Sequence, residues 1–293
     1  MKKLICLLLC MLMLPTICRG EAAFPCREYE FTHRAVRSYD SETLKYRVES
    51  FVVKRVRCYL VKVWMQDPGR QIRKVTAEWR KKIRLPADMM REIPEAVLAI
   101  NGSGYVSPVY PWIPEDYPGE NRDYYYTPLG SLTVTDGEIF RNLEGVPYFG
   151  LTLEEDGLRM VTGEDNETVL AGNPTQTWSF YVQCPMQRNG EILTPEDWSF
   201  ADKKARRTVI ARADANNYLI LSVTNDGGTG LTLHEVNSFF LKHFEPLEWI
   251  YNLDGGPSSA LMVRKRPGAK VKRLAGGGAR DADIMAFVEL PEE

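Results

Sequence analysis

The sequence predicts a single α+β domain with a mixed, hairpin-rich β-sheet and few helices. Apolar and polar residues alternate with a period of two over 47–53 and 56–65, in stretches rich in Val, Tyr and Phe. Such alternation is typical of strands with one buried face. The dipeptides Asp136-Gly137 and Asn189-Gly190 each separate two strand-like runs, as in tight β-hairpins. A helical spacing of apolar residues follows Thr232.

The N-terminus has the pattern of a signal peptide. Lys2 and Lys3 precede an apolar run over 4–15, which is too short to span a bilayer as an ordinary helix. We therefore expect residues 1–20 to be removed and the chain to be secreted or to reside in the periplasm or cell envelope. The cysteines of this region lack a lipoprotein acylation motif, and no other stretch reaches roughly 18 apolar residues, so no integral membrane association is expected.

The rest of the chain suits one large domain. We interpret residues 21–60 as an N-terminal extension and 61–293 as the main domain. Within it, 70–84 carries seven basic side chains and one acidic one. We interpret this segment as a solvated face, with a patch for an anionic polymer as the alternative. The segment 107–126 is expected to be a long loop whose aromatic rings could stack on sugars.

Charge and cysteine content restrict the function classes. The predicted leader contains three basic and no acidic residues, so its loss changes the net charge from −2 to −5, which argues against a dedicated nucleic-acid binder. The three cysteines that remain allow at most one intramolecular disulfide, and Cys26 with Cys58 is the favoured pair. The scattered cysteines and histidines do not predict a zinc site. No cofactor is predicted, and the sequence leaves a divalent cation open.

Two short stretches offer functional groups at strand ends. Residues 95–100 predict a buried strand that runs into Asn101-Gly102, where an amide side chain and flexible backbone donors suit a sugar or a phosphate. Asn-Gly is also a common turn. Near the C-terminus, an apolar strand over 249–253 ends at Asp254, which is followed by glycines, serines and a second apolar run over 260–263.

The stretch around Asp254 is the main candidate for a functional site. A strand aims the carboxylate, and Gly255 and Gly256 allow a ligand to approach the backbone closely. The alternative is a simple Asp-Gly turn between two strands, capped by Ser258 and Ser259.

Three further positions are candidates. Arg207 opens a predicted strand pair, and an arginine can hold two phosphate oxygens at once, although an arginine at a strand edge also discourages aggregation. Thr232 and Glu235 have the spacing of a capping box, which favours a structural role for Glu235. Arg280 precedes the last predicted strand, 283–290.

Taken together, these motifs resemble the phosphodiester glycosidase family over residues 61–290. The specific motifs are 252–259, Asn-Leu-Asp-Gly-Gly-Pro-Ser-Ser, and Asn101-Gly102 at the end of its strand. The chain departs from the family at Ile210-Ala211, where relatives usually have a glycine, and at the turn 225–228, which is shorter and lacks an arginine.

The resemblance implies hydrolysis of a sugar-1-phosphodiester in an envelope or host glycopolymer, with N-acetylglucosamine as one candidate sugar. It implies that Asp254 acts as base or nucleophile and that Glu235 is the second carboxylate if one is needed. Arg207 and Arg280 would hold the phosphate. The remaining candidates would bind the substrate: Asn101, Gly102, Thr232, Gly255, Gly256 and Ser258.

Two other classes stay open. A non-catalytic cell-envelope glycan-binding protein would keep the fold and tolerate the loss of Asp254. A serine hydrolase would use Ser258 or Ser259 with His234 or His243 as its base, but the chain has no Gly-x-Ser-x-Gly motif.

Overall fold

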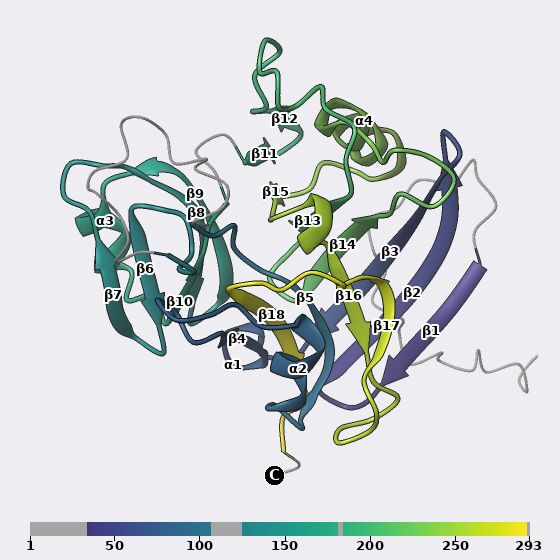
Figure 1. Ribbon diagram of the computed structural model, residues 1–293, viewed down its shortest axis with the longest axis horizontal. Coiled ribbons are helices and arrows are strands. Elements are labelled where there is room, and N and C mark those ends of the chain that lie inside the picture. The colour runs from purple at the N-terminus through teal and green to yellow at the C-terminus, as the bar shows by residue number, and fades with distance from the viewer. Residues whose placement is uncertain (1–33, 107–124, 181–183, 292–293) are drawn as a thin grey trace, which may run out of the picture.

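The computed structural model describes residues 34–106, 125–180 and 184–291 (Figure 1). Of the described residues 47% are strand and 13% are helix, so the fold is largely β with the predicted scarcity of helices. In the described part, every pair of strands is antiparallel. The prediction of a mixed sheet is therefore wrong, because strands close in the sequence pair as hairpins and strands distant in the sequence also pair in opposite directions.

The main sheet has eight strands in the order β1-β2-β3-β14-β13-β15-β11-β12. Residues 34–60, part of the predicted extension, supply β1 and β2 to this sheet. The predicted strands at 47–53 and 56–65 are confirmed and pair along their full length. The bounds are β1 Arg34–Asp40, β2 Leu44–Val53, β3 Val56–Met65, β14 Asn217–Val223, β13 Arg207–Arg212, β15 Trp249–Asn252, β11 Pro185–Arg188 and β12 Glu191–Ile192.

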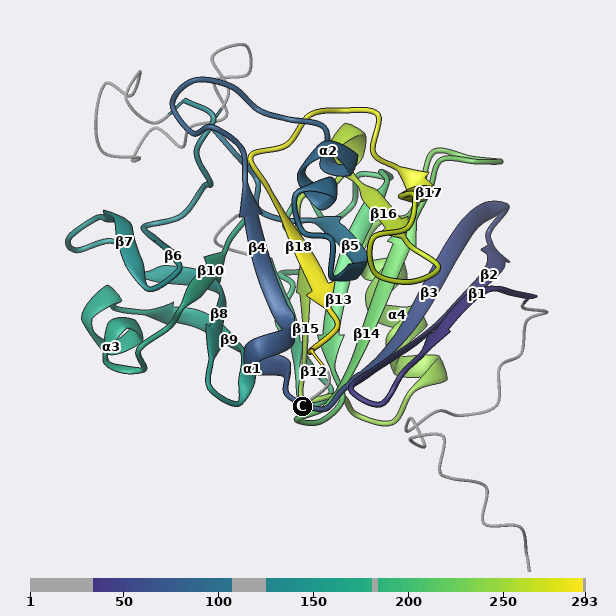
Figure 2. The ribbon, with the colours of Figure 1, turned by 90° about the horizontal axis from the view of Figure 1, so that it is seen from below.

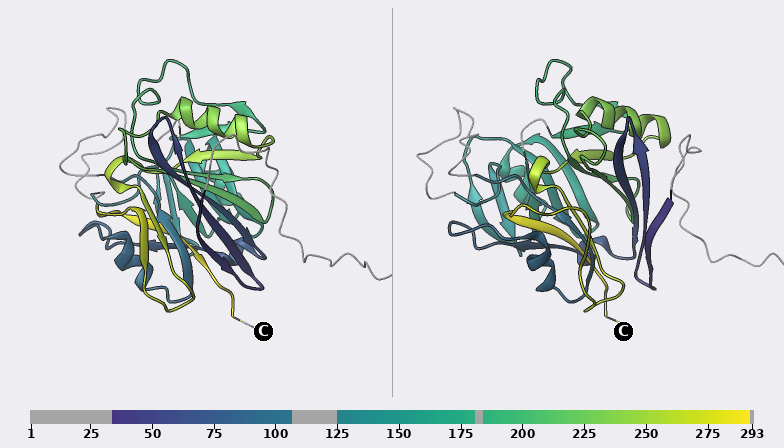
Figure 3. Two further views of the ribbon diagram at one scale, coloured as in Figure 1. Left: turned by 90° about the vertical axis from the view of Figure 1, so that its right-hand side faces the viewer. Right: turned by 45° about the vertical axis from the view of Figure 1, so that its right-hand side comes forward.

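One face of the main sheet is covered by α4, Leu233–His243, which Figure 3 shows lying across the strands. Phe239, Phe240 and Phe244 pack there against Leu219 and other residues of β14. The predicted capping box is confirmed, because the helix begins with reciprocal hydrogen bonds between Thr232 and Glu235.

A second sheet of five strands has the order β17-β16-β5-β18-β4 (Figure 2). Its bounds are β17 Lys272–Gly276, β16 Ala260–Val263, β5 Ala96–Asn101, β18 Asp283–Val288 and β4 Ile72–Thr76. The short helix α2, Pro86–Arg91, packs on this sheet. Every residue of the predicted strand β5 is buried, because Leu98 and Ile100 enter the core shared with the main sheet while Ala99 faces the α2 side.

The third sheet, drawn at the left of Figure 1, has the order β7-β6-β10-β8-β9. The predicted hairpin at Asp136-Gly137 is confirmed, and both residues have positive φ. The bounds here are β7 Glu138–Asn142, β6 Leu132–Thr135, β10 Gln176–Trp178, β8 Tyr148–Glu154 and β9 Gly157–Glu164, with helices α1 Pro68–Gln71 and α3 Asn166–Ala171. A single hydrophobic core joins the three sheets, with Ile210, Leu98 and Leu151 among its members.

Several predictions concern residues outside the described ranges. The predicted leader, Cys26 and most of the aromatic loop lie there. Among the described residues Cys58 is a buried free thiol; the favoured Cys26–Cys58 disulfide involves Cys26, which lies outside them, and stays a prediction. None of the described helices is long and apolar enough to cross a membrane.

Candidate active site

The two strand-end motifs meet, although they are far apart in the sequence. Asn101 is the last residue of β5, and Asp254 follows β15 by two residues. The Asn101 Nδ2 donates to the Asp254 carbonyl oxygen at 2.7 Å, and the Asp254 N–H donates to the Gly102 carbonyl oxygen at 3.2 Å. The structure therefore brings Asn101, Gly102 and Asp254 into one place.

The Asn101 side chain is largely committed to the protein. It is completely buried, and its Oδ1 accepts from the Thr208 hydroxyl at 2.6 Å and from the Ala260 N–H at 2.9 Å. Together with the bond to Asp254, these contacts leave one of its N–H groups. Asn101 therefore holds the turn that carries Asp254, and the predicted contact with substrate stays a prediction.

Glycines at 102 and 256 allow the two strand-end turns to pack closely against their neighbours. A Cβ at Gly102 would lie 1.9 Å from the Asp283 Oδ1, so a larger residue would displace that carboxylate. Gly256 has a φ of +57°, which a glycine adopts at little cost, and its N–H donates to the Arg206 carbonyl oxygen at 2.9 Å. The short 3₁₀ turn η2, Gly256–Ser258, is thereby held against the start of β13.

A second carboxyl group lies near Asp254. Asp281 is 1% exposed, and its negative charge and that of Asp254 oppose each other. The Ser258 hydroxyl approaches both carboxyl groups. Even so, neither Asp281 oxygen has a hydrogen bond of ordinary geometry from the residues that the structure describes.

Burial sets the protonation of this pair. Burial raises the pKa of Asp254 to about 6, while the Ser258 hydroxyl and the Gly255 N–H oppose the rise and the charge of Asp283 adds to it. Burial also raises the pKa of Asp281 well above its ordinary value, and the charge of Asp254 contributes. Asp254 is partly exposed and is therefore the carboxyl group of the pair that ionises first.

A buried ion pair between Lys74 and Asp283 lies next to the turn that follows Asn101. The Asp283 Oδ1 accepts from the Ser103 N–H at 2.7 Å, and its Oδ2 lies 3.3 Å from the Lys74 Nζ. Lys74 also donates to the Thr177 carbonyl oxygen at 2.5 Å. Lys74 belongs to the basic segment 70–84, which we expected to be a solvated face, but its side chain is completely buried.

The predicted arginines differ in environment. Arg207 is 1% exposed and donates to the carbonyl oxygens of Leu231, Phe200 and Lys203. Burial lowers the pKa of Arg207 to about 10. Arg280 is exposed and directly precedes Asp281.

The capping-box residues lie at the start of α4. The Glu235 carboxylate accepts from the Thr232 N–H at 2.9 Å and lies 2.8 Å from the Lys54 Nζ. Both of its oxygens are thus bound to groups that stabilise the fold. The contacts of Glu235 support the structural interpretation, and its role as second carboxylate stays a prediction.

Sequence reasoning did not identify Asp281, Asp283 or Lys74. The available signal was that Asp281 and Asp283 follow within three residues of Arg280, a position already singled out. Lys74 carried no signal, because nothing in its own segment indicates burial. Among the described residues, no group of three or more His, Cys, Asp or Glu side chains is placed to hold a metal ion.

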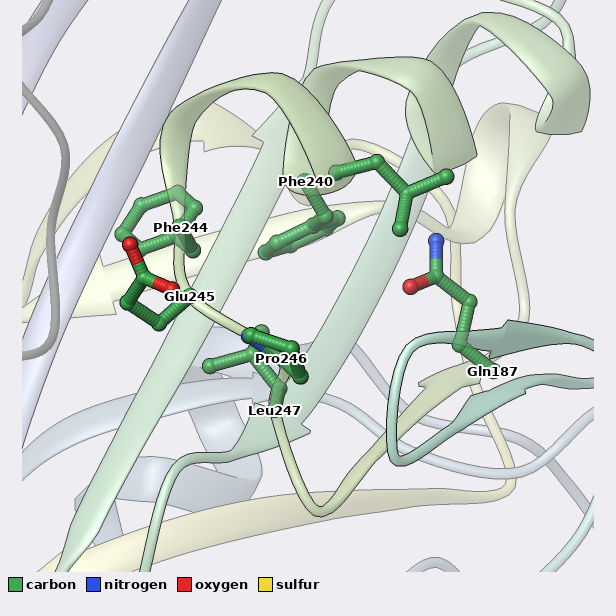
Figure 4. A pocket seen from close by; sticks show the side chains of 7 residues that line it. Gln187, Phe240, Phe244, Glu245, Pro246 and Leu247 are labelled. Atoms are coloured by element: carbon green, nitrogen blue, oxygen red, sulfur yellow. The ribbon is translucent and has the colours of Figure 1, made fainter.

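A small pocket of about 60 Å³ lies elsewhere, at the end of α4 (Figure 4). Phe240, Phe244 and Leu247 make much of its wall apolar, and Gln187 closes one side. None of the candidate site residues lines this pocket. It therefore has no part in the site around Asp254.

Comparisons with known proteins identify a family and similar folds. A profile of the phosphodiester glycosidase family matches residues 94–287, whereas no curated protein matches the sequence. The catalytic domain of zebrafish N-acetylglucosamine-1-phosphodiester alpha-N-acetylglucosaminidase, auto-inhibited by a pro-peptide, is similar in structure. Its TM-score is 0.60 at 16% identity, over 89% of this chain and 88% of that one.

Two bacterial structures are also similar. A hypothetical protein from Synechocystis has a TM-score of 0.52 at 13% identity, over 85% of this chain and 63% of its own. A Burkholderia pseudomallei protein described as exported has a TM-score of 0.50 at 9% identity, over 80% of this chain and 74% of its own. At these identities the similarity concerns the fold alone. Because the family profile spans more than half of the sequence, the chain belongs to the phosphodiester glycosidase family.

Proposed function

We propose that this chain is an exported hydrolase that cleaves a sugar-1-phosphodiester, releasing the free sugar and a phosphomonoester. The observation that carries the proposal is the turn at Asp254, where a partly exposed carboxyl group lies near a second, buried carboxyl group of Asp281 with the Ser258 hydroxyl beside both. Membership of the phosphodiester glycosidase family supports the reaction class. Export rests on the leader pattern in the sequence.

Asp254 is suited to be a general base. A base works best when its pKa lies near the working pH, and with a pKa of about 6 this carboxyl group is ionised at neutral pH. Water attacks the anomeric carbon and gives its proton to Asp254, while the bond between that carbon and the phosphate oxygen breaks. The phosphomonoester leaves as a stable anion, so proton donation to the leaving group matters less than in ordinary glycosidases.

Asp281 replaces Glu235 as our second carboxyl group. Its raised pKa keeps it protonated when Asp254 is ionised, so the two groups avoid adjacent negative charges. The Ser258 hydroxyl, which carries one proton, can accept from a protonated Asp281 and donate to Asp254. This arrangement orients the Asp254 carboxylate.

The phosphate would be held by exposed and buried positive charge. Arg280 is exposed beside Asp281 and is our candidate for direct contact. Arg207 makes its side-chain hydrogen bonds to carbonyl oxygens, so its charge has no carboxylate partner among the described residues. A buried cation without a counter-charge favours an anion nearby, and the Arg207 backbone adjoins Gly255.

The test is sugar release from a panel of sugar-1-phosphodiesters, including N-acetylglucosamine-1-phospho-methyl, by wild type and by Asp254→Asn. Release by wild type alone supports the proposal. If no member of the panel is cleaved while labelled envelope glycans bind with equal affinity to both proteins, the chain is a glycan-binding protein instead.

A serine hydrolase finds less support. Ser258 lies beside two carboxyl groups. His234 lies 3.7 Å from Asp202, and His243 packs against Phe239, so both histidines have partners of their own on or near α4. Labelling of Ser258 by a fluorophosphonate probe would contradict our assignment.

A further inference from the structure

The hairpin of β16 and β17 is strongly and exclusively basic. From Gly255 to Arg280 the chain has seven basic residues and no acidic one, although the whole chain has a net charge of −2. One of the seven, Arg264, is buried and donates to carbonyl oxygens that include those of Ile93 and Ala96. It anchors the start of the loop that joins the two strands. The other six are exposed: Lys265, Arg266, Lys270, Lys272, Arg273 and Arg280.

These six cations have no carboxylate partner among the residues that the structure describes. Some exposed basic residues elsewhere form ion pairs within 4.0 Å, as Lys45 does with Asp40 and Lys82 with Glu78. In the part of the chain that the structure describes, none of the six has such a pair. Like charges held together repel each other, and a bound polyanion would relieve that repulsion.

The basic hairpin leads to the active-site turn. β17 is the edge strand of the second sheet, drawn in yellow in Figure 2. The Arg273 Nη1 donates to the Gly277 carbonyl oxygen at 3.2 Å, and the Gly277 N–H donates to the Ser259 carbonyl oxygen at 2.7 Å. Ser259 follows Ser258 directly. At about 3.3 Å per strand residue, Lys272 lies roughly 13 Å along the strand from Gly276.

We propose that the edge formed by these six residues, the basic edge, binds a chain of sugars joined by phosphodiesters while one linkage occupies the site at Asp254. This inference rests on the proposed function and names its substrate as a polymer. One phosphodiester carries one negative charge and can neutralise only one of these cations. A chain with one charge per repeat can meet cations that extend from Arg280 to the hairpin tip at Lys265.

The test is binding of a fluorescein-labelled oligomer of about six N-acetylglucosamine-1-phosphate repeats, measured by fluorescence anisotropy in the Asp254→Asn background. The tip variant is Lys265→Gln/Arg266→Gln/Lys270→Gln. The matched control is Arg55→Gln/Arg188→Gln/Lys204→Gln, which removes the same charge from exposed positions on or beside the main sheet. Circular dichroism checks that both variants fold.

The tip variant is expected to raise the Kd of the oligomer at least about tenfold, and the control less than about twofold. The slope of log Kd against log salt is expected to be shallower in the tip variant, because fewer counterions are released. Equal Kd values in the tip variant and its control would overturn the proposal. Equal affinity of wild type for hyaluronan, a carboxylate polymer, would also overturn it.

Binding and hydrolysis are read separately. If wild type cleaves no diester but the tip variant alone loses oligomer binding, the proposed function fails and the basic edge stands. Suppose instead that wild type cleaves monomeric and oligomeric diesters with equal KM, and that the two KM values are also equal in the tip variant. The proposed function then stands and the basic edge fails.

Discussion

The Lys74 ammonium lies 3.3 Å from an Asp283 carboxylate oxygen, and both side chains are completely buried. Asp283 in turn accepts from the Ser103 N–H, and the neighbouring Gly102 carbonyl oxygen accepts from the Asp254 N–H. A continuous set of contacts thus runs from the buried lysine to the backbone of the proposed base. Removing one partner of a buried ion pair leaves the other charge without compensation.

We therefore expect Lys74→Met to lower the free energy of unfolding by about 3–5 kcal/mol. Urea unfolding at pH 7.5 measures this loss. The double variant Lys74→Met/Asp283→Asn removes both charges and is expected to recover part of it. A double variant less stable than Lys74→Met would show that the charge imbalance is not the cause.

Asp254→Asn is expected to lower kcat by a factor of about 10² to 10⁴, because a positioned general base contributes an acceleration of that size. The side chain keeps nearly the same shape, so the variant is expected to fold. Wild-type rates in this variant would remove Asp254 from the mechanism.

The same variant makes a prediction about stability. The folded-state pKa of Asp254, about 6, lies above its ordinary value of 3.8. Its contribution to stability is therefore fully present below pH 3.8 and is lost as the pH rises through about 6. Asn carries no charge, so Asp254→Asn is expected to match or exceed the wild-type melting temperature at pH 7.5 and to lose that advantage near pH 4. The melting temperature of the variant minus that of wild type should thus be larger at pH 7.5 than at pH 4. A smaller difference at pH 7.5 would contradict this prediction.

The pH dependence of wild-type kcat/KM follows from the same group. Below about pH 6 the rate is expected to fall about tenfold per pH unit as Asp254 is protonated. Because the charge of Asp283 raises the pKa of Asp254, Asp283→Asn is expected to move the inflection to lower pH. An inflection that stays in place in Asp283→Asn would argue that another group controls the rate.

Ser258→Ala is expected to reduce kcat/KM roughly 10- to 100-fold, because a hydrogen bond to a charged group is worth about 1.5–3 kcal/mol. Ser259→Ala is the matched control. The Ser259 hydroxyl is buried and has no hydrogen-bond partner among the described residues, so its loss is expected to change kcat/KM by less than about threefold. An equal loss of kcat/KM in the two variants would show that Ser258 has no specific role beside the two carboxyl groups.

Glu235→Gln tests the residue first suggested as a second carboxylate. Gln can complete a capping box, so the helix is expected to persist and the stability to fall by less than about 1 kcal/mol through the lost pairing with Lys54. Sugar release is expected to stay within about twofold of wild type. A loss of 100-fold or more would return Glu235 to the catalytic machinery, and Asp281→Asn, assayed beside it, would then be the less damaging change.

Elements with strong local signals were predictable. The strand β5, the capping box of α4 and the hairpin at Asp136-Gly137 depend on residues close together in the chain, and all three are confirmed. The edge strand β17 was not predicted, because its exposed Lys272 and Arg273 do not alternate with apolar residues. Its hydrogen bonds to β16 make it a strand.

The sequence by itself determined that a carboxylate, two glycines and two serines follow a strand at Asp254, since turn chemistry depends on neighbours in the chain. Only the tertiary structure decided that Asn101 clamps this turn, that Asp281 lies near Asp254, and that Lys74 is buried against Asp283. The protonation of a carboxyl group depends on its burial and on the charges around it. Strand pairing between distant segments sets both, and no local pattern records it.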